Sequence, residues 1–86
     1  MPTISRFYGI RIMMYYKDHA PPHFHAEYGD SEAVVQISPI GFIGGQLPPR
    51  ASSLVLEWAA LHQDELLADW RRCRDRLAPV PIAPLE

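Results

Sequence analysis

The sequence predicts an α+β fold: a small, three- or four-stranded, mainly antiparallel sheet with two C-terminal helical segments packed on one face. Three observations lead to this prediction. Apolar and polar residues alternate along much of the first half of the chain, as they do in half-buried strands. A two-residue turn containing glycine joins two of these stretches. The second half has a helical apolar periodicity that is broken once.

The first strands are predicted within residues 4–16. A period-two pattern places four apolar side chains on one side of the main strand: Ile10, Ile12, Met14 and Tyr16. Gly9 interrupts the pattern, so we expect a bulge or a break after a short leading strand at residues 4–8. Pro21 and Pro22 end the pairing because neither has a backbone N–H to donate.

A β-hairpin is predicted where residues 23–28 and 32–37 flank Gly29 and Asp30. Glycine at the first central position is what a type II′ turn requires. Pairing Tyr28 with Ser31 then gathers one apolar face: Phe24, Ala26, Tyr28, Ala33, Val35 and Ile37. The same register places His23, His25 and Glu27 on the other face. A shift by one residue would mix polar and apolar side chains on both faces.

The helical part follows a weak edge strand or irregular return at residues 40–47. Pro48 and Pro49 are typical of a helix entry, and the helical stretch continues to about Leu77. Its apolar stripe steps by five residues from Leu61 to Leu66, which predicts a bend or a two-helix hairpin near residues 62–64. We expect residues 1–77 to form a single domain and the proline-rich tail, residues 78–86, to be an extended arm.

The composition is typical of one soluble domain. The chain has 86 residues, of which 48% are hydrophobic, and a formal net charge of −2. This acidic balance argues against a protein that coats nucleic acid through bulk electrostatics. One cysteine permits no internal disulfide, and we find neither a leader peptide nor an apolar run of about 18 residues. We therefore expect a cytoplasmic protein that does not enter a membrane.

The predicted functional site is the run from residue 18 to residue 28, which has three of the four histidines within seven positions. Alternate residues on a strand are about 6.6 Å apart, so His23 and His25 can share one metal ion. His19, turned back by the two prolines, or another chain would supply the third ligand. A metal-binding hypothesis therefore uses His19, His23 and His25, with zinc, nickel or iron as the ion.

Metal-independent RNA cleavage is the second hypothesis, and it requires no cofactor. His23, His25 and Glu27 have the chemistry of general acids and bases. Arg11 or Lys17 would stabilise the developing phosphate charge. In a third hypothesis the histidines have no chemical role: they cap the Pro-Pro connection on a solvated sheet face, or that face binds a partner protein. As an interaction module, the chain would dock through its proline-rich tail or an exposed helix face onto a partner or a second copy of the chain.

Several stretches resemble one bacterial family, catalogued as domain of unknown function 4160. The most specific is DHAPPHFHA at residues 18–26; the others are MPTIS at 1–5, LPPR at 47–50 and LEWA at 56–59, with His62 beyond. The resemblance covers nearly the whole chain. It implies a compact product often encoded beside another small gene, as in toxin–antitoxin pairs. We therefore expect a toxin–antitoxin-like component that binds a small protein encoded nearby and cleaves RNA, with metal binding and a non-catalytic interaction module as alternatives.

Overall fold

The sheet has five antiparallel strands rather than three or four, and two helices follow it. The computed structural model describes residues 2–16 and 18–86. The elements in chain order are β1 Thr3–Phe7, β2 Ile10–Met13, β3 His23–Tyr28, β4 Ser31–Ile37, β5 Ile40–Gly45, α1 Pro49–Leu61 and α2 Gln63–Arg74. The strands lie in sequence order in the sheet. The α+β class is confirmed, and the strand count was too low because both the short leading segment and the glycine-rich return form paired strands.

The N-terminal strands form a tight hairpin. Tyr8 and Gly9 both have positive φ, 49° and 79°, as the two central residues of a type I′ turn do. Gly9 therefore marks the predicted break, and this break is a hairpin turn. The second strand was predicted to reach Tyr16 but ends at Met13, because the chain there leaves the sheet for the loop that leads to β3.

The register of the central hairpin is the predicted one. Tyr28 pairs with Ser31 across Gly29, whose φ is +57°, and the pairing continues to His23 and Gln36. Phe24 and Val35 are fully buried, in agreement with the predicted apolar face. Tyr28 is the exception: it lies at the end of the hairpin and is 39% exposed.

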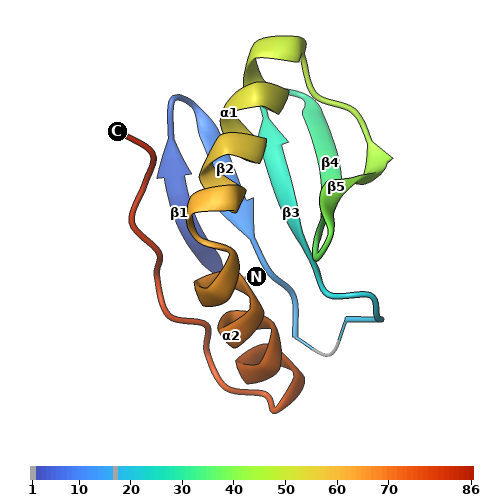
Figure 1. Ribbon diagram of the computed structural model, residues 1–86, viewed down its shortest axis with the longest axis vertical. Coiled ribbons are helices and arrows are strands. Elements are labelled where there is room, and N and C mark those ends of the chain that lie inside the picture. Colours follow the sequence, from blue (N-terminus) through green and yellow to red (C-terminus); the bar gives the residue numbers. More distant parts are fainter. Residues whose placement is uncertain (1, 17) are drawn as a thin grey trace.

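Both helices cover one face of the sheet, and the chain bends between them (Figure 1). The bend is at His62, whose N–H bonds to the carbonyls of Trp58 and Ala59, so the predicted break is confirmed. Trp58 is fully buried at the centre of the core, with its ring centroid 5.3 Å from that of Phe7 and 5.7 Å from that of Phe24. Neither helix is long and apolar enough to cross a membrane, within residues 2–16 and 18–86.

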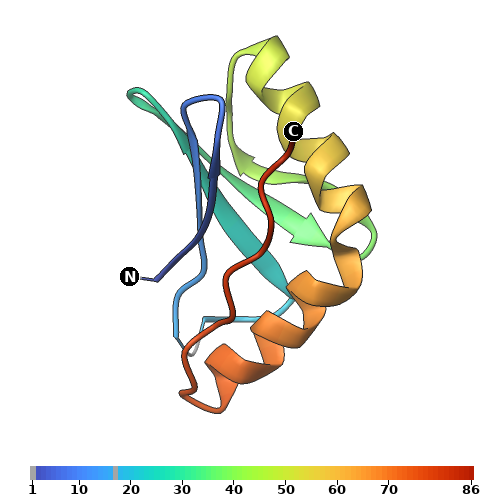
Figure 2. The ribbon, with the colours of Figure 1, turned by 90° about the vertical axis from the view of Figure 1, so that its left-hand side faces the viewer.

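The C-terminal tail is extended and lies beside α2 and the edge of the sheet (Figure 2). The N–H of Ile82 donates to the carbonyl of Ile4 at 2.8 Å, and the indole N–H of Trp58 donates to the carbonyl of Ala83 at 2.8 Å. Ile82 is buried in the main core. The tail therefore packs as a strap across the domain.

Candidate functional site

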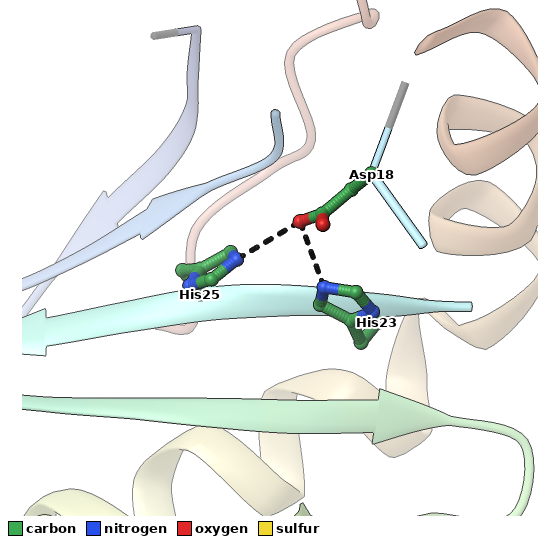
Figure 3. Close-up of side chains that lie close together, drawn as sticks. All are labelled: Asp18, His23 and His25. Carbon is green, nitrogen blue, oxygen red and sulfur yellow. Dashed lines mark hydrogen bonds and ion pairs between the residues drawn. The ribbon is translucent and has the colours of Figure 1, made fainter. Parts of the chain in front are cut away.

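Three polar side chains meet where β3 begins (Figure 3). His23 and His25 occupy alternate positions of β3, and Asp18 comes from the loop that precedes it. One carboxylate oxygen, Oδ2 of Asp18, lies 2.8 Å from Nε2 of His23 and 3.3 Å from Nε2 of His25. The three potential ligand atoms all lie within 4.8 Å of one another. The loop thus returns a carboxylate to the histidine face of the sheet.

Asp18 is held as an ionised carboxylate. Burial raises its pKa, but the backbone N–H of His19 and the rings of His25 and His23 more than offset this effect, so that the pKa lies below its ordinary value of 3.8. The N–H of His19 donates to the other carboxylate oxygen, Oδ1, at 2.9 Å. Oδ2 is thereby aimed at the two imidazoles.

The hydrogen bonds of His23 fix where one of its protons lies. Its Nδ1 is 2.8 Å from the carbonyl oxygen of Pro21, and a carbonyl can only accept, so Nδ1 carries a hydrogen. Nε2 then faces the Asp18 carboxylate. A neutral ring would place a lone pair against that negative oxygen. The arrangement is favourable with a second proton on the ring, which gives an ion pair, or with a metal cation held by both atoms.

Aromatic contacts hold both imidazole rings. The ring of Trp70, from α2, has its centroid 5.1 Å from that of His23. The ring of Tyr15 meets His25 edge to face at 4.3 Å. Nδ1 of His25 is buried without a hydrogen-bond partner within the described chain, and it lies 3.7 Å from Oε2 of Glu32. The rings are therefore oriented by packing, and one ring nitrogen has a carboxylate just beyond hydrogen-bonding distance.

The surroundings of the cluster are acidic. The pKa of the Tyr15 hydroxyl is raised by burial and then by the carboxylates of Glu32, Glu27 and Asp18, whereas Arg11 acts in the opposite direction. Three carboxylates thus act on the neighbourhood of one phenol. Such a field attracts cations and repels anionic phosphate groups.

The structure brings together only part of the predicted site. His23 and His25 lie side by side, as both hypotheses required. Glu27 instead forms an ion pair with Arg11, Oε1 to Nη1 at 3.8 Å, and belongs to no potential ligand cluster in the described residues. The predicted acid–base group therefore separates into two pairs.

The third member of the cluster is Asp18, which was not among the predicted ligands. His19 was expected in that position but is exposed and lies outside the cluster. Asp18 lies within the predicted site at residues 18–28, yet no periodicity tells which side chain of a proline-containing loop faces the sheet. Lys17, named as an alternative to Arg11, lies outside the described residues.

Comparison with known proteins identifies a family without an assigned activity. The model described as Domain of unknown function (DUF4160) matches residues 9–71, more than half of the chain. The matched range includes the whole Asp18–His23–His25 cluster, and Trp70 behind it. No curated protein and no solved structure gave a match.

Proposed function

The chain belongs to the DUF4160 family, and we propose that it is a divalent-metal-binding protein whose ligands are Asp18, His23 and His25. The observation that carries this proposal is the convergence of two imidazole nitrogens on one ionised carboxylate oxygen, at 2.8 and 3.3 Å. Two imidazoles and a carboxylate are a recurrent ligand set for first-row transition metals.

The spacing of the ligand atoms suits one ion. Zinc and its neighbours bind imidazole nitrogen and carboxylate oxygen at about 2.0–2.2 Å. For bonds of this length, neighbouring ligand atoms are separated by roughly 2.8–3.1 Å in octahedral sites and by roughly 3.3–3.6 Å in tetrahedral sites. The separation between His25 and Asp18 is 3.3 Å and that between His23 and Asp18 is 2.8 Å, so the shorter one needs only a small opening for a tetrahedral site.

The outer contacts also suit a metal site. A ligating histidine ordinarily donates its second ring N–H to a carbonyl or carboxylate, which fixes the tautomer. His23 already does so through Pro21. For His25, Oε2 of Glu32 lies 3.7 Å from Nδ1, so a small movement would let Nδ1–H donate to this carboxylate when Nε2 binds an ion. Three protein ligands leave coordination positions for water or a substrate, and zinc, nickel and iron are the candidate ions.

The RNA-cleavage hypothesis receives less support from the same geometry. Metal-free cleavage needs a free general base, a free acid and a cation for the phosphate. Nε2 of both histidines is directed at Asp18, and Arg11 is paired with Glu27. The surrounding carboxylates would also repel the substrate. RNA cleavage stays a prediction, tested by whether the metal-free protein degrades RNA and loses that activity in His25→Ala.

Metal binding is tested on protein purified without a histidine tag. Isothermal titration with Zn²⁺, and elemental analysis after dialysis, should give about one ion per chain. Replacing a ligand should lower the affinity by roughly a hundredfold or more, since even outer-shell partners are worth about 10–100-fold. The ligand variants are Asp18→Asn, His23→Ala and His25→Ala.

His19→Ala is the matched control, because it removes an exposed imidazole next to the cluster. It should leave the affinity unchanged. Substitution with Co²⁺ adds a visible spectrum that reports the coordination geometry, and this spectrum should change in Asp18→Asn. The proposal fails if zinc, nickel, cobalt and iron all bind below stoichiometry, or if His19→Ala weakens binding as much as His25→Ala does.

A partner protein and a cytoplasmic location remain part of the proposal. A metal site with open positions is compatible with a toxin–antitoxin-like component, whose ion either takes part in chemistry or orders a docking surface. Co-purification with the product of the neighbouring gene tests the partner. Equal affinity of wild type and Asp18→Asn for that product would show that docking does not depend on the metal ligands.

A further inference from the structure

The sheet face that points away from the helices carries a continuous row of charged side chains. Figure 2 shows that both helices lie on one side of the sheet. On the other side, consecutive Cα partners across β1, β2, β3 and β4 are Arg6, Arg11, Glu27 and Glu32. Residues paired in this way point to the same face of a sheet. The row is therefore positive over β1 and β2 and negative over β3 and β4.

This order of charges is unfavourable within one chain. Like charges directly opposite each other on neighbouring strands destabilise a sheet, and the row has two such pairs, Arg6 with Arg11 and Glu27 with Glu32. Arg11 and Glu27 neutralise each other in the middle, at 3.8 Å. Arg6 is exposed and has no ion-pair partner in residues 2–16 and 18–86, and the side chain of Glu32 is 50% exposed. The two ends of the row thus present opposite charges to solvent.

The row is complementary to itself. In a symmetric face-to-face dimer, the two-fold axis lies between the two sheets. If this axis runs parallel to the strands and passes between β2 and β3, the facing copy presents the charges in reverse order. Arg6 of each copy then lies over Glu32 of the other copy, at both ends of the row. An axis perpendicular to the strands would instead place like charges over each other.

The uncovered face can accept a second sheet. Packed sheets lie about 10 Å apart, with their strands within about 30° of each other, and long arginine and glutamate side chains can meet across that gap. Val34 lies on the same face and is half-buried. Its Cα partner on β5 is Gly44, which has no side chain to cover it. The face thus adds apolar surface to the complementary charges.

We propose that this face binds a second copy of the chain, in a two-fold dimer held at its ends by Arg6 of each copy and Glu32 of the other. Complementary charges of this kind fix the register of an interface and exclude other arrangements. The end contacts use none of the three proposed metal ligands. Measurements in EDTA therefore test the dimer independently of the metal site.

Charge reversal at the two ends is the test. In an Arg6→Glu homodimer the new carboxylates face Glu32, and in a Glu32→Arg homodimer the new guanidinium groups face Arg6. Each substitution should weaken dimerisation at least about tenfold, because it makes both symmetric end contacts repulsive. Within one chain each substitution places opposite charges on neighbouring strands, so neither should impair folding. Sedimentation equilibrium at low ionic strength, where screening is weak, measures the dissociation constant.

A mixture of the two variants provides the decisive measurement. In the mixed dimer both end contacts again join opposite charges, so its dissociation constant should lie within about threefold of the wild-type value. The double variant Arg6→Glu/Glu32→Arg should dimerise equally well. Within one chain Arg6 and Glu32 are three strand spacings apart, about 14 Å, so this rescue requires contact between chains.

Arg50→Glu and Glu57→Arg are the matched controls. Both positions are exposed on α1, and the two substitutions change the net charge by the same amounts as the test variants. Both controls should dimerise as wild type does. A wild type that stays monomeric at about 1 mM, a mixture that does not associate, or controls that weaken the dimer as much as the test variants would overturn the proposal.

Discussion

Asp18 and Asp69 are both withdrawn from solvent, yet the protein treats their charges in opposite ways. Burial raises the pKa of both carboxyls. Asp18 is met by a backbone N–H and two imidazoles, and its pKa falls below the ordinary value. Asp69 is met by one backbone N–H, and its pKa stays raised. The side chain of Asp18 is also 24% exposed, whereas Asp69 is 2% exposed. The difference teaches that the number of donors, weighed against the depth of burial, decides which carboxylate stays ionised at little cost.

The two sites also differ in how far apart their parts lie in the sequence. Asp18, His23 and His25 lie within eight consecutive residues. The donor to Asp69 is Val80, eleven positions away on a segment without regular secondary structure. The first site is built by a local loop and one strand, whereas the second exists only when the tail is in place.

The largest expected effect is the stabilisation of the fold by Zn²⁺, which should depend on Asp18 and not on Asp69. Zn²⁺ at about 100 times its dissociation constant should stabilise the wild type by about 2.7 kcal/mol. For a domain of this size that is a rise of roughly 10 °C or more in Tm. Asp69→Asn should keep this rise, and Asp18→Asn should lose most of it. Thermal unfolding with Zn²⁺ or with EDTA measures this rise in Tm. An equal rise in both variants would show that Zn²⁺ does not bind through Asp18.

The next effect concerns the metal-free protein. Asp18→Asn should lower the free energy of unfolding at pH 7 by about 1.5–3 kcal/mol, the usual worth of hydrogen bonds to a charged group. Because the folded pKa of Asp18 is lowered, its contribution is present above the ordinary value of 3.8 and disappears as pH falls through the folded value. Urea unfolding at pH 7 and near pH 3 should therefore show a penalty that shrinks in acid. A penalty independent of pH would mean that the charge of Asp18 is not what stabilises the loop.

These two sites show where sequence reasoning succeeds. The register of the β3–β4 hairpin followed from Gly29 and the alternation of side chains, so the common face of His23 and His25 was predictable. The choice of Asp18 over His19 was not, because neighbouring loop residues have no period that sets their direction. The available signal was a carboxylate that precedes two prolines and a His-x-His strand. Only the structure of the loop shows that this carboxylate reaches the two histidines.

The missed parts of the fold have a similar cause. The number of strands was underestimated because glycine-rich residues 40–45 have weak strand propensity, and their pairing with β4 supplies the stability. The tail was predicted to be extended, and it is. That its Val80 would close on Asp69 and its Ile82 would enter the core depends on contacts between distant residues, which composition does not encode.

The effect of Asp69→Asn on the free energy of unfolding should have the opposite sign to that of Asp18→Asn. The folded pKa of Asp69 is raised, so ionisation destabilises the fold progressively as pH rises above the ordinary value of 3.8. The variant should be more stable than wild type at pH 7 by about 1 kcal/mol, and this advantage should vanish near pH 3. Asp64→Asn, in the exposed first turn of α2, is the control; it removes a charge that favours the helix dipole and should lower the stability by about 0.3–1 kcal/mol, the opposite sign to Asp69→Asn. A loss of stability in Asp69→Asn at pH 7 would show that this carboxylate has a partner that the amide cannot replace.

The smallest effect tests whether the first site ends at three residues. Glu27 lies on the same strand face as His23 and His25, but its carboxylate is 41% exposed and reaches Arg11 at 3.8 Å. Exposed ion pairs of this kind contribute little, so Glu27→Gln should change the free energy of unfolding by less than about 0.5 kcal/mol. Its Zn²⁺ affinity should stay within roughly twofold of wild type, because outer-shell effects of 10–100-fold need a direct contact with a ligand. Calorimetry on Glu27→Gln beside Asp18→Asn measures both quantities. A drop in Zn²⁺ affinity comparable to that of Asp18→Asn would make Glu27 a ligand. The metal site would then extend from the beginning of β3 to near its end.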